Sequence, residues 1–254
     1  MLTRTEAIVL KSRNYSEADL IVTYLTADRG IINAFAKSPR KTKSRFGSSL
    51  EPLTHARISL WGKEQTAMPR LTQSDIITSF YQLRENYTDF INLSKLLEIL
   101  ISLTPEHIPN RKLFSFLLNM LELIKSSVQE SKDALYMIAQ IRLLALIGYA
   151  PRLKGCAKCS THSLDFYPSS GATLCIRCAS VPGSGEKKFI RTNNKVIHFY
   201  THTIEWPINI TNRLKPDQAT ISELSTLLDR HLDYLLSKRL HSSTIFRRAV
   251  ILRL

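Results

Sequence analysis

All four cysteines of this 254-residue chain fall in one short segment, as Cys156-Ala-Lys-Cys159 and Cys175-Ile-Arg-Cys178. Two C-x-x-C turns separated by fifteen residues are typical of a site in which four thiolates hold one zinc ion. The intervening Tyr167-Pro-Ser-Ser-Gly171 favours a turn that brings the second pair back to the first. Because four protein ligands leave no position for water, we expect a structural zinc and not a catalytic one.

Other uses of the cysteines stay open at this point. Two disulfides would need an oxidising compartment, whereas the N-terminus lacks the apolar core of a secretory signal and favours a cytoplasmic protein. A redox-active pair normally has one C-x-x-C beside a βαβ pattern, and a metal-free remnant is a further alternative. His162 lies between the pairs and could replace a cysteine, but four cysteines complete the shell, so we expect it in a surface loop.

The chain is strongly basic, with a net charge of +14, and this points to a polyanionic partner such as nucleic acid. The positive charge is concentrated in residues 1–80, 151–199 and 230–254, whereas basic and acidic side chains balance over residues 81–150. The length favours two domains with a small insert. No apolar segment is long enough to cross a bilayer.

Residues 1–80 predict a small β-barrel. Five strands are expected, over 7–10, 20–25, 31–36, 54–61 and about 67–79. In the fourth, the alternation predicts that Ala56, Ile58 and Leu60 face inward and that His55, Arg57, Ser59 and Trp61 face outward. Five short strands fit a barrel of the oligonucleotide-binding (OB) type, although periodicity alone does not separate it from an SH3-like barrel.

A basic segment lies between the third and fourth expected strands, where Pro39 and Gly47 indicate a loop. Five cations fall within nine positions: Lys37, Arg40, Lys41, Lys43 and Arg45. On the rim of such a barrel they are candidates for phosphate contacts, although a basic run can also be merely solvated. Three aromatic residues, Tyr15, Phe46 and Trp61, could stack on bases or could pack in the core.

Residues 81–254 predict a helical domain that carries the zinc turns at 154–180. Apolar residues recur at helical spacing over 90–100, 113–124 and 135–145, and the third helix should end near Gly148. Further helices are expected over 187–203 and 219–236. The tail after them turns basic again at Lys238 and Arg239.

Motifs for nucleotide hydrolysis or dinucleotide binding are missing from the sequence. Glu17 and Asp19 come closest to a carboxylate pair, and a solvated turn explains them equally well. We therefore predict that the protein is not an enzyme.

Several of these stretches, taken in order, resemble the bacterial RecO family of DNA-repair proteins. They are Tyr15-Ser-Glu-Ala-Asp19, then Thr26 and Gly30, the basic segment from Ala36 to Arg45, Leu146-Ile-Gly-Tyr-Ala-Pro151 before the cysteines, and 231–243. The resemblance covers the chain from end to end. One departure is Ser38, where the family usually has glycine, and we expect a different bend of the loop there.

The resemblance implies a recombination mediator that binds single- and double-stranded DNA and anneals complementary strands without ATP, in the cytoplasm and associated with the nucleoid. It implies RecR, single-stranded-DNA-binding protein and RecA as partners. By the same resemblance, the five cations of the basic segment contact DNA, with Lys238 and Arg239 as further candidates, and the four cysteines bind Zn²⁺. Two alternatives remain, a zinc-containing protein-interaction scaffold and an RNA-binding module.

Overall fold

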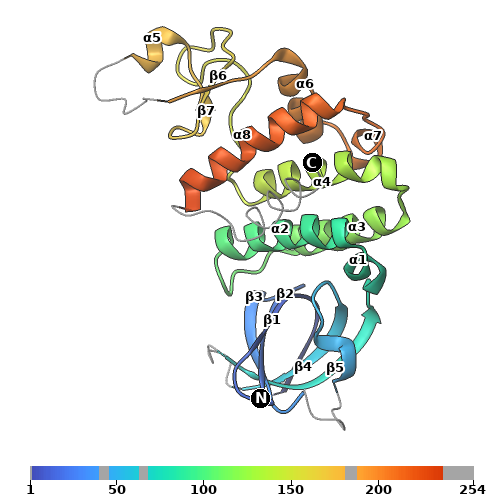
Figure 1. Ribbon diagram of the computed structural model, residues 1–254. Coiled ribbons are helices and arrows are strands. Elements are labelled where there is room, and N and C mark those ends of the chain that lie inside the picture. Colours follow the sequence, from blue (N-terminus) through green and yellow to red (C-terminus); the bar gives the residue numbers. More distant parts are fainter. Residues whose placement is uncertain (1, 40–45, 63–67, 181–187, 237–254) are drawn as a thin grey trace. The chain divides into compact units, whose positions relative to one another are not determined.

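The computed structural model describes residues 2–39, 46–62, 68–180 and 188–236. The chain divides into two compact units, Met1–Ser126 and Ser127–Leu254. The first unit holds a five-stranded barrel followed by helices, and the second holds helices and the segment with the four cysteines (Figure 1). The predicted α+β architecture, with the barrel first and the helices after it, is confirmed.

The barrel is closed, and its five strands overlap the expected positions, although β1 is longer at both ends than the expected 7–10. They are β1 (Leu2–Asn14), β2 (Leu20–Thr26), β3 (Gly30–Ala36), β4 (His55–Trp61) and β5 (Arg70–Thr78). Their order around the barrel is β1-β2-β3-β5-β4. Only β3 and β5 pair in parallel; the other neighbours are antiparallel. This five-stranded closure fits the OB type of barrel.

Small side chains fill much of the barrel interior. Ala7, Ala34 and Ala56 are fully buried there, and they leave room for the ring of Tyr24. The 3-10 helix η1 (Gly47–Leu50) adds Leu50 to the same core. In β1 the register shifts between Val9 and Lys11, so this long strand changes the face that its residues present.

The prediction for the outward residues of β4 was half right. Arg57 and Trp61 are exposed, but His55 and Ser59 are buried, at 6% and 5% exposure. His55 lies edge-on to the ring of Phe114, with the ring centroids 5.8 Å apart. A helix of the same unit therefore covers this part of the outer wall, and such cover cannot be read from the alternation of a single strand.

Three helices complete the first unit, namely α1 (Tyr81–Glu85), α2 (Tyr87–Leu103) and α3 (Arg111–Ser126). The loop between α2 and α3 packs tightly on the turn between β2 and β3. Gly30 has φ +68°, and a Cβ there would lie 2.1 Å from the carbonyl oxygen of Ile108. The backbone N–H of His107 also donates to the carbonyl of Ile31, at 2.9 Å. Only glycine fits this turn.

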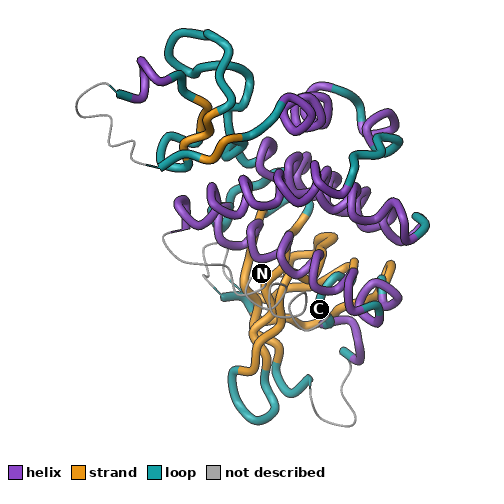
Figure 2. Tube along the Cα trace, turned by 45° about the horizontal axis from the view of Figure 1, so that its top comes forward, coloured by secondary structure: helices purple, strands orange, loops and turns teal. Residues whose placement is uncertain are grey.

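In the second unit, α4 (Gln129–Leu146), α6 (Asn194–Glu205) and α8 (Gln218–Leu236) pack against one another, and α7 (Ile208–Thr211) follows α6. Between α4 and α6 lies a small module that contains the cysteines. Its strands β6 (Asp165–Tyr167), β7 (Ala172–Thr173) and β8 (Ile190–Arg191) form a sheet in the order β7-β6-β8, and α5 (Ile176–Ala179) is a single turn. Figure 2 shows these short strands in orange among the loops of the module.

One helix begins later than predicted. Residues 187–203 were expected to be helical, but Ile190 pairs with Phe166 in the sheet and the helix starts at Asn194. Residue 187 lies outside the described part of the chain. The start is set by Asn193, whose side chain accepts the backbone N–H of Val196 at 3.0 Å.

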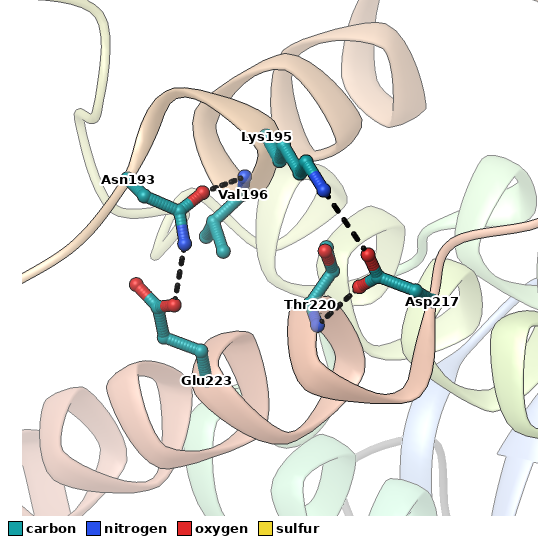
Figure 3. Close-up of polar contacts among 6 residues, drawn as sticks. All are labelled: Asn193, Lys195, Val196, Asp217, Thr220 and Glu223. Atoms are coloured by element: carbon teal, nitrogen blue, oxygen red, sulfur yellow. Dashed lines mark hydrogen bonds and ion pairs between the residues drawn. The ribbon is translucent and has the colours of Figure 1, made fainter.

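The N-terminal residues of α6 and α8 also join the two helices to each other (Figure 3). Asn193 donates its amide to Glu223 of α8, at 2.6 Å. In the opposite direction, Asp217 accepts the N–H of Thr220 at 2.8 Å and forms an ion pair with Lys195 of α6, at 3.4 Å. Asn193 and Asp217 therefore each cap the N-terminus of their own helix and also bond to a side chain of the neighbouring helix.

Candidate metal centre and nucleic-acid interface

The two C-x-x-C turns converge on one point. Cys156 and Cys159 belong to a tight turn closed by the N–H of Ser160 on the carbonyl of Cys156, at 2.8 Å. Cys175 precedes α5, and Cys178 lies in it. The four sulfur atoms all lie within 4.8 Å of one another, and those of Cys159 and Cys175 are 3.6 Å apart. A tetrahedral zinc with Zn–S bonds of about 2.3 Å requires sulfur–sulfur distances of about 3.8 Å, so the donor set fits this ion.

The electrostatics of the cluster also suit a cation. Burial raises the pKa of Cys156, but hydrogen bonds from backbone groups of Cys175, Lys158 and Cys159 outweigh it and bring this pKa to about 6. The pKa of Cys178 is instead raised to about 12, mainly by its hydrogen bonds with the side chains of Cys159 and Cys175. Four sulfurs this close cannot all ionise alone, whereas a bound dication deprotonates its thiol ligands.

Lys158 joins the two turns. It lies in the first C-x-x-C sequence, and its ammonium donates to the carbonyl of Cys178 in the second, at 3.2 Å. The exposed Arg177 occupies the equivalent place in the second sequence. Each turn therefore carries a cation directly before its second cysteine, next to a cluster of thiols.

The module is attached to the helices of its own unit by a buried histidine. The ring Nε2 of His231 in α8 lies 2.8 Å from the carbonyl oxygen of Tyr149, to which it donates. The same ring lies edge-on to Phe166 in β6. A Cβ at Gly171, which has φ +62°, would lie 2.9 Å from the ring. His231 belongs to one of the stretches that resemble the RecO family, but the sequence assigned it no role. Its contacts with Phe166 and Tyr149 depend on tertiary packing, which the sequence pattern does not reveal.

The basic segment is described only at its start. Lys37 directly follows β3 and is exposed, whereas Arg40, Lys41, Lys43 and Arg45 lie outside the described residues, as do Lys238 and Arg239. Ser38 has φ +55°, a left-handed conformation that glycine adopts without strain. Its N–H donates to the side chain of Asp19, at 2.7 Å. Asp19 therefore stabilises the backbone at the start of the basic segment and does not simply lie in a solvated turn.

The three candidate aromatic residues lie in different environments. Phe46 is buried in the barrel core, at 3% exposure, so of its two possible roles core packing is confirmed and base stacking is excluded. Tyr15 and Trp61 are exposed, at 65% and 60%. These two remain candidates on the surface of the barrel.

Acidic neighbours take up part of the positive charge around the cysteine turns. Lys154 pairs with Glu205, Lys195 with Asp217 and Arg191 with Asp165. Within the described ranges, Arg152, Lys158, Arg177 and Lys188 make no ion pair with a carboxylate. The cations of the module are thus only partly neutralised. Over the same ranges, every helix is too short or too polar to span a membrane.

Comparison with known proteins gives matches over nearly the whole chain. The family model described as "Recombination protein O N terminal" matches residues 1–80, and "Recombination protein O C terminal" matches residues 84–244. A DNA repair protein RecO from Thermodesulfovibrio yellowstonii is 41% identical, over 90% of this chain and 91% of the relative.

Two further relatives carry the same description. DNA repair protein RecO from a Nocardioides species is 38% identical over 72% of this chain and 77% of its own length. The protein of that description from Dehalococcoides mccartyi strain 195 is 30% identical, and the match covers 92% of this chain and 91% of the relative. These similarities extend over the barrel, the helices and the cysteine module.

Proposed function

Because this chain belongs to the RecO family of DNA repair proteins, we propose that it is a non-enzymatic recombination mediator that binds DNA and anneals complementary single strands without ATP. The observation that carries the proposal is the OB-type barrel from whose third strand the basic segment departs. Lys37, Arg40, Lys41, Lys43 and Arg45 would contact phosphates there, with Lys238 and Arg239 as a second group.

Annealing needs no fuel if the protein relieves the repulsion between two strands. Cations that face both strands screen their charge and raise the local concentration of one strand near the other. Base pairing then drives the reaction. We propose that the protein works in this way on chromosomal DNA in the cytoplasm. By the family resemblance, it acts with a RecR-like protein, single-stranded-DNA-binding protein and a RecA-like recombinase, which it helps to load.

The four cysteines would hold a structural Zn²⁺, which fixes the fold of the module and supplies no reactive position. We also propose that the DNA-binding domain is the barrel itself, residues 1–80, and that 81–254 form the helical domain. The two compact units of the structure divide the chain at a later point, because α1, α2 and α3 belong to the same unit as the barrel. The family boundary between residues 80 and 84 supports the proposed one.

An annealing assay with two complementary oligonucleotides, with and without ATP, tests the proposal. We expect the protein to accelerate annealing equally in both conditions. Affinity for single strands should fall with salt at a log–log slope of about −0.7 for each phosphate contact. A slope near zero would refute the electrostatic mechanism.

Matched charge variants separate this function from the scaffold alternative. Changing Arg40 and Lys41 to alanine should weaken DNA binding and flatten the salt dependence. Changing Arg111 and Lys112, two exposed cations at the start of α3, removes the same charge from the same unit and should have little effect. Equal effects of the two pairs would favour a general role of charge, and parallel titrations with RNA would identify an RNA-binding module.

A further inference from the structure

A row of directly paired residues crosses all five strands on the outside of the barrel, from Leu2 at the start of β1 to Arg13 near its end. Direct pairs link its members from strand to strand, because Leu2 faces Trp61, Trp61 faces Arg70, and Arg70 faces Phe35. The row continues from Phe35 to Ile21 and from Ile21 to Arg13. We call these residues the outer row: Leu2, Trp61, Arg70, Phe35, Ile21 and Arg13.

The barrel interior shows which way the outer row faces. Residues next to it in the strands, namely Val22, Ala34, Ala36, Leu60 and Leu71, belong to the interior core. Successive residues of a strand point to opposite faces, and directly paired residues share a face. The outer row therefore projects away from the core on all five strands.

Trp61, Arg70 and Phe35 follow one another along the row, whereas Arg13 is separated from Phe35 by Ile21, which is buried at 3% exposure. Trp61 is 60% exposed, and Arg70 beside it is exposed as well. Next comes Phe35, on which the exposed Tyr15 packs edge-on with ring centroids 5.6 Å apart. Arg13 ends the row and is also exposed. Among the residues that the structure describes, neither arginine makes an ion pair.

We propose that the outer row binds the bases of a single-stranded nucleic acid, with Trp61 and the Tyr15–Phe35 pair as stacking surfaces and Arg70 and Arg13 as phosphate contacts. Isolated exposed aromatic residues are common on protein surfaces. Here Arg70 lies between Trp61 and Phe35 on a path that crosses the strands, and aromatic surfaces beside a cation are the combination that single-strand binding uses. This inference rests on the proposed function and assigns it a site.

The spacing of the row suits stacked nucleotides. Neighbouring strands lie about 4.8 Å apart, so Trp61 and Phe35, on either side of β5, are separated by about 10 Å. A stacked strand advances about 3.4 Å for each nucleotide, so about three nucleotides span this distance. A short stretch of single strand can therefore contact both aromatic surfaces while its phosphates pass Arg70.

The consequence is a preference for single strands that charge alone does not provide. Phosphates are present in single and double strands alike, but the faces of the bases are exposed only in single strands. The outer row would therefore hold the strands before annealing and lose its stacking contacts when the duplex forms. The product would then dissociate more readily than the substrate without any hydrolysis of ATP.

Fluorescence can test the stacking directly, because Trp61 is one of only two tryptophans in the sequence. In Trp206→Phe, Trp61 is the remaining reporter, and adding oligo(dT) should quench its emission at saturation. In Trp61→Phe, the emission of Trp206 should change little. Equal or absent quenching in the two proteins, with binding confirmed by anisotropy of a labelled oligonucleotide, would overturn the inference.

Affinities of substituted proteins supply the second test. Trp61→Ala should weaken single-strand binding by roughly tenfold and leave double-strand binding within about twofold of the wild type. Trp61→Phe should keep most of the affinity, because it keeps a ring. The control Tyr87→Ala removes another exposed ring of the same unit, in α2, and should change neither affinity.

The outcomes separate the inference from the proposed function. Unchanged single-strand affinity in a folded Trp61→Ala protein would overturn the outer row as a base-binding site, while loss of binding in the Arg40 and Lys41 variant would still support the proposed function. An equal loss of affinity for single- and double-stranded DNA in Trp61→Ala would also overturn the outer row as a base-binding site, since stacking is possible only with single strands. If the wild type bound neither, both proposals would fall.

Discussion

At the scale of single residues, a few positions determine the turns and junctions of the fold. Ser38 has a left-handed backbone, and Gly30 lies where no side chain fits. Gly171 leaves space for the ring of His231, which hydrogen-bonds the carbonyl of Tyr149. These residues set the geometry of turns and junctions.

Replacing Ser38 by glycine should stabilise the first unit. A non-glycine residue in the left-handed region costs about 1 kcal/mol, and glycine removes this strain at some cost in chain entropy. We expect the free energy of unfolding to rise by about 0.5 kcal/mol, measured by urea denaturation. Ser48→Gly, in η1, is the control and should be neutral or destabilising; a loss of stability in Ser38→Gly would contradict the argument.

His231 should make stability depend on pH. Burial lowers its pKa below the usual 6.5, and the hydrogen bond to Tyr149 opposes this only in part. Its Nδ1 is buried without a hydrogen-bond partner, so protonation would place an unpaired N–H there. The unfolded chain therefore takes up the proton at higher pH than the folded protein.

The stability that neutral His231 contributes is complete above about pH 6.5 and is lost as pH falls through the lowered pKa of the folded state. Melting temperatures from pH 7.5 to 5.5 should fall more steeply for the wild type than for His231→Gln, which does not titrate. Parallel curves would exclude His231 as the source.

At the scale of elements, local patterns predicted the strands and helices but not their partners. The alternation in β4 identified the strand, while the burial of His55 depends on packing against Phe114 of a distant helix. Segment 187–203 was read as one helix because a two-residue strand is too short to leave a pattern. The cysteine spacing predicted the cluster well, because each turn is local. The outer row was not predicted, since it depends on the register of β5 against β3 and β4.

We expect Lys158 to strengthen the binding of zinc by the four cysteines. Four thiolates exceed the charge of Zn²⁺, and Lys158 both adds a positive charge and joins the turns through the carbonyl of Cys178. We expect Lys158→Met to release zinc several-fold faster to a colorimetric chelator. Lys154→Met is the matched control because Lys154 pairs with Glu205 instead. Equal release rates in both variants would contradict this role.

At the scale of the whole molecule, the chain combines two units with separate sources of stability. The barrel has an apolar core of its own. The cysteine module has only a small cluster, in which Tyr167, Leu174 and Ala179 pack beside Cys156. With so small an apolar cluster, we expect the module to depend on a metal held by the four cysteines, whereas the barrel has a core that needs none.

Loss of zinc should therefore damage one part of the protein only. In Cys156→Ser, elemental analysis should find only a trace of bound zinc. Protease cleavage within 152–191 should be at least tenfold faster than in the wild type. Cleavage within the barrel, mapped by mass spectrometry, should be unchanged. Uniform sensitivity along the chain would show that the metal stabilises both units, and zinc-free wild-type protein would refute the metal site.

The parallel contact between β3 and β5 closes the barrel through one directly facing pair, Phe35 and Arg70, and one further bond from the N–H of Phe35 to Pro69, at 2.9 Å. All other neighbouring strands share seven facing pairs. We expect the β3–β5 pairing to open before the other strand pairs in thermal fluctuations. The amide of Phe35 should therefore exchange with deuterium faster than the amides in the middle of β2. A nucleic-acid strand bound across Trp61, Arg70 and Phe35 would hold β3 and β5 together. Slower deuterium exchange of the Phe35 amide in the complex would show this stabilisation.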